Sequence, residues 1–157
     1  MKSMLGMAIH IAAEQFAGVC DKGGVPYIMH CLYVMDNTEG GDCVKCAAVL
    51  HDVIEDNKPS SPVIWTFEKL YKVGFSDKTI MLLKLVTHLD GETYAEYITR
   101  ICIDLEAIGL KKADLEHNSC ITRLKGIRPK DHQRIEKYHK AYHRLQEAEA
   151  VLLGQTH

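Results

Sequence analysis

Four ionisable side chains stand close together in the otherwise apolar segment 47–56: His51, Asp52, Glu55 and Asp56. On an α-helix successive residues are about 100° apart, so all four share a stripe about 140° wide. Charged groups on an apolar helix persist only when they are paired or coordinate a metal. A solvated helix end is the alternative, but it would set Glu55 and Asp56 against the helix dipole. The segment therefore predicts a face that binds a cation.

Two more possible ligands lie in other apolar segments. His30 stands one turn into a predicted helix that otherwise faces the core, and Asp114 has apolar neighbours on both sides. A single histidine in such a place is most often a core residue, so its interpretation as a ligand depends on the whole set. Two imidazoles and two carboxylates suit Mn²⁺, Fe²⁺ or Mg²⁺ better than a closed zinc site. They also leave coordination positions for a phosphate and a nucleophile.

The order of these motifs resembles the HD superfamily, whose signature is a histidine, a His-Asp pair and a distant aspartate. More narrowly, the sequence is similar to the hydrolase domain of the stringent-response (p)ppGpp enzymes and to their small stand-alone relatives. The matching motifs come in the family's order within about residues 5–145: Gly24 to His30, Leu50 to Asp56, Leu85 to His88, and Lys111 to Asn118.

The resemblance implies a role for each group of site residues. One divalent metal, usually manganese in this family, with Fe²⁺ or Mg²⁺ as alternatives, is expected on His30, His51, Asp52 and Asp114. The attacking water is expected to be handled by Glu55 and Asp56. The nucleotide site is expected to be lined by Lys22, Lys111 and Asn118. The implied reaction is removal of pyrophosphate from the ribose 3′ position of (p)ppGpp.

Two departures from the family pattern concern the substrate. Asp21 stands where many members carry an arginine, and Glu116 lies in a segment that often carries a basic residue after the aspartate. Both changes leave the predicted metal ligands intact. They keep open a second hypothesis, a phosphatase for another nucleotide with a 2′- or 3′-phosphate, such as NADPH. A third hypothesis is a metal-bearing nucleotide sensor without turnover, against which the Glu55–Asp56 pair argues.

The elements that position these residues all have helical periodicity, and no stretch alternates with period two. The sequence predicts an all-α fold of about seven to eight helices in a single HD-type domain over residues 1–157. The predicted helices cover about 3–18, 26–36, 42–54, 61–73, 76–88, 93–106, 109–124 and 130–153. Ser61 and Ser76 are the predicted caps of the fourth and fifth helices, and Trp65 and Phe67 are predicted core residues.

Composition narrows the class of partner. The net charge of −2 gives no overall attraction to nucleic acid or to an anionic membrane. No apolar run is long enough to span a bilayer, and the first residues predict no secretion signal. Six cysteines without a disulfide or zinc spacing indicate reduced thiols, so a cytoplasmic protein is expected. The family resemblance implies a small-molecule nucleotide as its partner. Both a monomer and a homo-oligomer remain open.

Two further groups have competing interpretations. His139 and His143 have a spacing that could hold a metal, but Lys137, Lys140 and Arg144 around them favour a solvated helix surface. Tyr94 and Tyr97 follow a loop that could close over the site. They could equally be packing residues.

Overall fold

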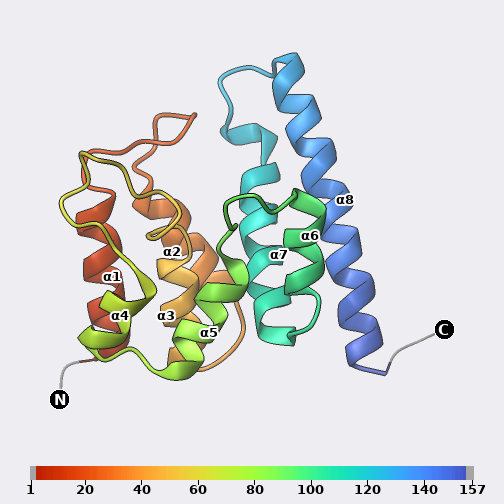
Figure 1. The fold of residues 1–157 in the computed structure, drawn as a ribbon. Coiled ribbons are helices and arrows are strands. Elements are labelled where there is room, and N and C mark those ends of the chain that lie inside the picture. The colour runs from red at the N-terminus through yellow and green to blue at the C-terminus, as the bar shows by residue number, and fades with distance from the viewer. Residues whose placement is uncertain (1–2, 155–157) are drawn as a thin grey trace.

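Eight α-helices and one short 3₁₀-helix make up the computed structural model, which describes residues 3–154 (Figure 1). No β-strand occurs in this part of the chain, so the all-α prediction is confirmed. The α-helices are α1 (Met4–Gln15), α2 (Ile28–Asn37), α3 (Asp42–Leu50), α4 (Phe67–Val73), α5 (Asp77–Val86), α6 (Tyr94–Ile101), α7 (Leu105–Ser119) and α8 (Pro129–Leu152). The 3₁₀-helix η1 (Ile121–Arg123) lies between α7 and α8.

Side-chain caps fix where several helices begin. Ser76 caps α5 by accepting from the Thr79 amide, as predicted. Thr93 and Glu96 form a capping box at the start of α6. Pro129 occupies the first turn of α8, where its missing N–H costs nothing.

The fourth helix begins at Phe67, six residues later than the start predicted at Ser61. Thr66, not Ser61, is its cap, since the Thr66 hydroxyl accepts from the Lys69 amide. The segment before it is held as a loop by Asn57, whose side chain bonds both the N–H and the C=O of Trp65. The predicted helix start at Ser61 is therefore wrong.

Three other predicted boundaries are also wrong. Asp104 caps α7 by accepting from the Ala107 amide at 2.8 Å, so α6 ends at Ile101 and α7 begins at Leu105. The helix predicted to reach residue 54 ends as α3 at Leu50, and residues 51–56 form turns.

The core is built around α3, whose six residues Val44 and Cys46 to Leu50 are at most 1% exposed. Each large side chain buried in this way contributes about 2 kcal/mol. Helix α3 packs against α1, α2 and α5, and α7 packs against α2 and α8. Trp65 and Phe67 are only partly buried against this core. None of the described helices is long and apolar enough to cross a membrane.

The site lies where these packed helices meet at one end of the molecule. Helices α1 to α5 occupy one side of Figure 1 and α6 to α8 the other. The loop before α2, the turns after α3 and the segment between α7 and α8 all lie toward the upper end of that view. Because α2 contacts both α3 and α7, side chains at this end can converge.

Candidate metal centre

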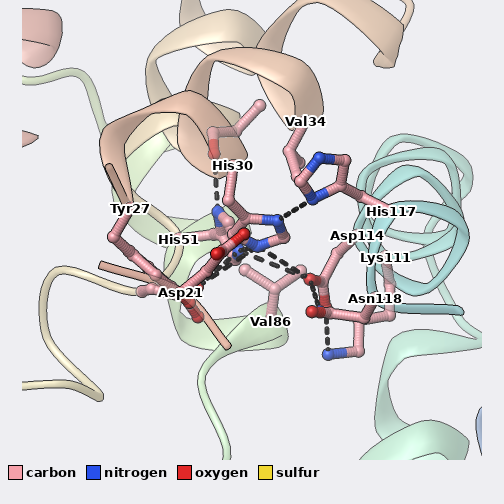
Figure 2. A network of polar contacts seen from close by, with 12 residues as sticks. Asp21, Tyr27, His30, Val34, His51, Val86, Lys111, Asp114, His117 and Asn118 are labelled. Carbon is pink, nitrogen blue, oxygen red and sulfur yellow. Dashed lines mark hydrogen bonds and ion pairs between the residues drawn. The ribbon is translucent and has the colours of Figure 1, made fainter. Parts of the chain in front are cut away.

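Two histidines and two aspartates from three parts of the chain meet here. Figure 2 shows His30, His51 and Asp114 close together. His30 comes from α2 and Asp114 from α7. His51 and Asp52 directly follow α3. The Nε2 atoms of His30 and His51 are 3.3 Å apart. Asp52 Oδ2 lies 2.9 Å from His51 Nε2 and 3.5 Å from His30 Nε2. Asp114 Oδ1 lies 3.2 Å from His30 Nε2 and 3.7 Å from His51 Nε2.

These separations fit donors around one divalent cation. With metal–ligand bonds of about 2.1 Å, two donors are about 3.0 Å apart at a right angle and about 3.4 Å apart at a tetrahedral angle. The ligand atoms of His30, His51 and Asp52 all lie within 4.8 Å of one another. The structure thus brings together all four side chains that the sequence predicts as metal ligands.

The hydrogen bonds of His30 leave its Nε2 free to bind a cation. Arg123 Nη1 lies 2.7 Å from His117 Nδ1, and a guanidinium only donates, so this His117 nitrogen is the acceptor. His30 Nδ1 lies 2.7 Å from the same nitrogen and therefore carries the proton that it donates. His117 belongs to a matching motif, but its sequence position alone gave it no role.

The ring of His51 is oriented by the backbone. Its Nδ1 donates to the carbonyl oxygen of Ala48 at 2.8 Å, which leaves Nε2 with its lone pair toward the cluster. A second hydrogen bond of this kind fixes the tautomer of metal-binding histidines in many proteins. Both imidazoles are therefore held in the form that a metal requires.

The two aspartates are also held by neighbouring groups. Tyr27 Oη donates to Asp52 Oδ2 at 2.6 Å. Asp114 accepts from Lys111 Nζ at 2.7 Å and from Asn118 Nδ2 at 2.6 Å. Lys111 and Asn118, predicted to bind substrate, line the pocket, and both also contact Asp114.

The cluster favours positive charge. Burial alone would raise the pKa of Asp114, but the Lys111 ammonium and the two imidazoles hold it well below its ordinary value. Burial opposes a charge on His51, yet the neighbouring carboxylates raise its pKa well above the usual range. Ionised carboxylates beside imidazoles attract either protons or a cation, and the two compete for the same lone pairs.

Glu55 and Asp56 line the same pocket as His30, Asp52 and Asp114. Although α3 has ended, the Asp56 amide donates to the Asp52 carbonyl at 2.9 Å, so a helical spacing is kept locally. Glu55 Oε2 accepts from the His88 amide at 3.0 Å. Partial burial, together with the charges of Asp52 and Glu55, raises the pKa of Asp56 to about 6. A carboxyl group with this pKa suits proton transfer near neutral pH.

A pocket of about 550 Å³ opens from this cluster, a size typical of small-molecule sites. Lys22, predicted to bind nucleotide, is among its exposed lining residues. Tyr94 lines it too, whereas Tyr97 is a buried packing residue that also reaches its wall. The sequence gave no site role to four further lining residues: Arg123, Arg134, Lys137 and Tyr138. His139 and His143 lie exposed on α8, as predicted for a solvated surface.

Asp21 does not present a free negative charge to the pocket. One carboxylate oxygen accepts from the amides of Gly23 and Val25 at 2.8 and 2.9 Å, and the other pairs with Arg123. Gly23 is required here because a Cβ would lie 2.5 Å from the Arg123 carbonyl oxygen. The charge reversal at residue 21 is therefore offset by an arginine from a distant part of the chain.

Comparison with known proteins supports the fold that the sequence motifs predicted. A solved structure of a metazoan ortholog of SpoT that hydrolyzes ppGpp superposes with a TM-score of 0.73. The similarity covers 99% of this chain and 96% of the other, at 19% sequence identity. The chain has the HD-domain hydrolase fold. This confirms, for the fold, the resemblance that the sequence motifs predicted.

A second similarity is to a much longer protein. A probable GTP pyrophosphokinase of Mycobacterium leprae (strain TN) is 32% identical over 128 residues, which cover 74% of this chain. The chain spans only 15% of the length of that relative. No protein-family model matches the chain.

Proposed function

We propose that this protein is a metal-dependent phosphohydrolase that removes pyrophosphate from the 3′ position of (p)ppGpp, and that residues 1–157 form one catalytic domain. The observation that carries the proposal is the pair of imidazole Nε2 atoms 3.3 Å apart between two ionised aspartates, at the end of a pocket. The fold shared with a ppGpp hydrolase supports the choice of substrate.

The metal site consists of His30, His51, Asp52 and Asp114 in this proposal. Its mixed nitrogen and oxygen donors favour Mn²⁺, with Fe²⁺ and Mg²⁺ as alternatives. When bound, such an ion polarises a phosphate oxygen and lowers the pKa of a coordinated water.

The surrounding residues supply positioning and proton transfer. Asp56 accepts the proton of the attacking water, and Glu55 orients that water. Lys22 offsets phosphate charge. Lys111 and Asn118 line the nucleotide site and hold Asp114 in place. The partner is a small-molecule nucleotide rather than nucleic acid or a membrane.

The case for another substrate rested on Asp21. Because the Asp21 carboxylate is paired with Arg123, no structural observation favours NADPH over (p)ppGpp. The sensor hypothesis predicts no need for carboxylates beside the metal ligands, but Glu55 and Asp56 both line the pocket.

The test is release of phosphate or pyrophosphate with Mn²⁺ from ppGpp, pppGpp, ppApp and NADPH. Turnover of ppGpp that is lost in His51→Ala supports the proposal. Turnover of NADPH alone would contradict (p)ppGpp as the substrate and would still support metal-dependent phosphohydrolysis. A Glu55→Ala/Asp56→Ala variant that still binds Mn²⁺ by calorimetry should lose activity. If the wild type binds Mn²⁺ and turns over none of the four nucleotides, the sensor hypothesis replaces this one.

A further inference from the structure

Arg134 of α8 is a pocket-lining cation with unused hydrogen-bonding capacity. Its side chain is only 20% exposed, and its Nε has no hydrogen-bond partner among residues 3–154. Its Nη2 forms an ion pair with Asp131 Oδ1 at 3.6 Å, a distance longer than a hydrogen bond, and this pair leaves Nε without an acceptor. A buried guanidinium donor without an acceptor is costly, so this arrangement indicates a missing acceptor.

Lys137 lies one turn further along the same side of α8. Its Nζ is 4.5 Å from the centre of the Tyr94 ring and 5.2 Å from that of Tyr138. Both tyrosines line the pocket, as Lys137 does. Cation–π contacts restrict the ammonium to the pocket wall without neutralising it. No carboxylate in the described part of the chain forms an ion pair with it.

Two other cations of the pocket are held by short contacts to carboxylates. Lys111 is bound to Asp114, and Arg123 is bound to Asp21. Arg134 and Lys137 therefore concentrate positive charge on the α8 wall, on residues that are not metal ligands. Residues three apart on a helix face the same way. Two adjacent cations of this kind, one of them planar with several donors, suit a group with several anionic oxygens.

We propose that Arg134 and Lys137 form a subsite on α8 that binds a diphosphate group of a nucleotide. The binding itself does not depend on turnover, but the orientation of the nucleotide rests on the proposed function. Two diphosphates have this chemistry: the 5′-diphosphate of the nucleoside, and the pyrophosphate that leaves from the 3′ position. The volume of about 550 Å³ accommodates a whole nucleotide across the pocket.

Binding to the protein treated with EDTA tests the subsite without catalysis. The probes are GDP, guanosine and inorganic pyrophosphate, measured by calorimetry. We expect an Arg134→Gln/Lys137→Gln variant to weaken binding of GDP or pyrophosphate about tenfold or more and to leave guanosine unchanged. Lys140→Gln is the matched control, because Lys140 pairs with Glu136 on the exposed face of the same helix.

Single variants guard against loss of folding. Lys137 is exposed, so Lys137→Gln should keep the melting temperature of the wild type and still weaken binding. Arg134→Lys, which keeps the positive charge, should bind GDP or pyrophosphate more tightly than Arg134→Gln and more weakly than the wild type. Equal affinity in the wild type and the double variant, or no binding of either diphosphate by the wild type, overturns the subsite.

Steady-state kinetics then separate the two diphosphates. If the 5′-diphosphate occupies the subsite, the double variant raises KM for ppGpp about tenfold and leaves KM for guanosine 3′-diphosphate unchanged. If the leaving pyrophosphate occupies it, both substrates are affected equally. Normal GDP or pyrophosphate binding without turnover of any substrate contradicts the proposed function and leaves the subsite standing.

Discussion

His117 illustrates how a neighbouring residue can control the protonation of a proposed metal ligand. It accepts from His30 Nδ1 and Arg123 Nη1, both at 2.7 Å, and so fixes the proton of His30 on the side away from the cluster. Burial and the nearby charges of His30 and Arg123 lower the pKa of His117 to about 4, so it stays neutral and can accept. Its function depends on remaining uncharged at physiological pH.

We therefore expect His117→Ala to weaken Mn²⁺ binding by about tenfold or more, as loss of outer-shell partners typically does. Calorimetric titration of the metal-free protein measures this. His139→Ala, an exposed histidine on α8, should bind Mn²⁺ like the wild type. An unchanged affinity in His117→Ala would mean that the proton position on His30 does not depend on this contact.

Single residues also show why the sequence predicted the metal ligands but not the rest of the pocket. The side chains of His51 and Asp114 are chemically unusual in apolar segments, so their types alone drew attention. Arg134 and Lys137 lie on a helix whose polar positions look like any solvated surface. Which side of α8 faces a pocket depends on how it packs against α6 and α7, and no local pattern carries that information.

At the scale of elements, the Asp21–Arg123 pair joins the loop before α2 to the segment after α7. Gly23 packs against the Arg123 backbone at the same place. In a double-mutant cycle of Asp21→Ala and Arg123→Ala, we expect a coupling energy of about 1 kcal/mol or more, measured by urea unfolding. The cycle cancels the separate loss of the hydrogen bonds that Asp21 accepts from the Gly23 and Val25 amides.

The matched control for this cycle is the pair Glu136 and Lys140, whose side chains are 64% and 72% exposed. Exposed pairs of this kind give coupling of about 0.5 kcal/mol or less. A coupling for Asp21 and Arg123 no larger than this control would show that the loops are held together by other contacts.

A second connection between elements is sensitive to pH. Arg100 of α6 donates to both oxygens of Glu92 at 2.8 Å and to the carbonyl oxygens of Lys84, Leu85 and Thr87 at the end of α5. The hydrogen bonds from Arg100 lower the pKa of Glu92 from 4.5 to about 2. A carboxyl group whose pKa is lower in the folded state stabilises the protein above its unfolded pKa and loses this effect in acid.

We expect Glu92→Gln to be less stable than the wild type by about 1–2 kcal/mol at pH 7. The difference should stay constant down to about pH 5 and then shrink below 4.5, because Glu92 takes up a proton in the unfolded chain while it stays ionised in the folded protein. Urea unfolding from pH 7 to pH 3.5 measures it. A difference that does not change with pH would assign the loss to altered packing rather than to the charge.

Local contacts set some helix boundaries, and contacts between residues further apart in the sequence set others. The start of α5 was predictable because Ser76 lies directly before its helix and bonds within it. The late start of α4 was not, because Asn57 holds the intervening loop through contacts eight residues away with Trp65. Asp104 lies within the helix predicted over 93–106, although aspartate is an ordinary cap residue and Asp104 caps α7.

At the scale of the whole molecule, the fold holds a cluster of ionised groups against its apolar core. His30, His51 and Asp114 are at most 4% exposed, and the largely buried α3 leads directly into His51. Desolvating these charges lowers stability unless they are compensated. Protons on the imidazoles compensate in part when no metal is bound. A divalent cation offsets both aspartates at once.

Metal binding should therefore stabilise the entire domain. Relative to protein treated with EDTA, Mn²⁺ at 100 times its Kd should add about 2.7 kcal/mol to the free energy of unfolding. For a chain of this length that raises the Tm by about 5–10 °C. Mn²⁺ should act more strongly than Ca²⁺ at equal concentration, because imidazole nitrogens suit transition metals.

Two variants locate the origin of this stabilisation in a thermal melt. His51→Ala should abolish the Mn²⁺-dependent rise in Tm, because it removes a ligand from the centre of the cluster. His139→Ala/His143→Ala should keep the full rise, since these exposed residues lie on α8 outside the pocket. The reverse pattern would indicate that the metal binds on α8. The buried charges at the end of α3 would then have no cation to compensate them.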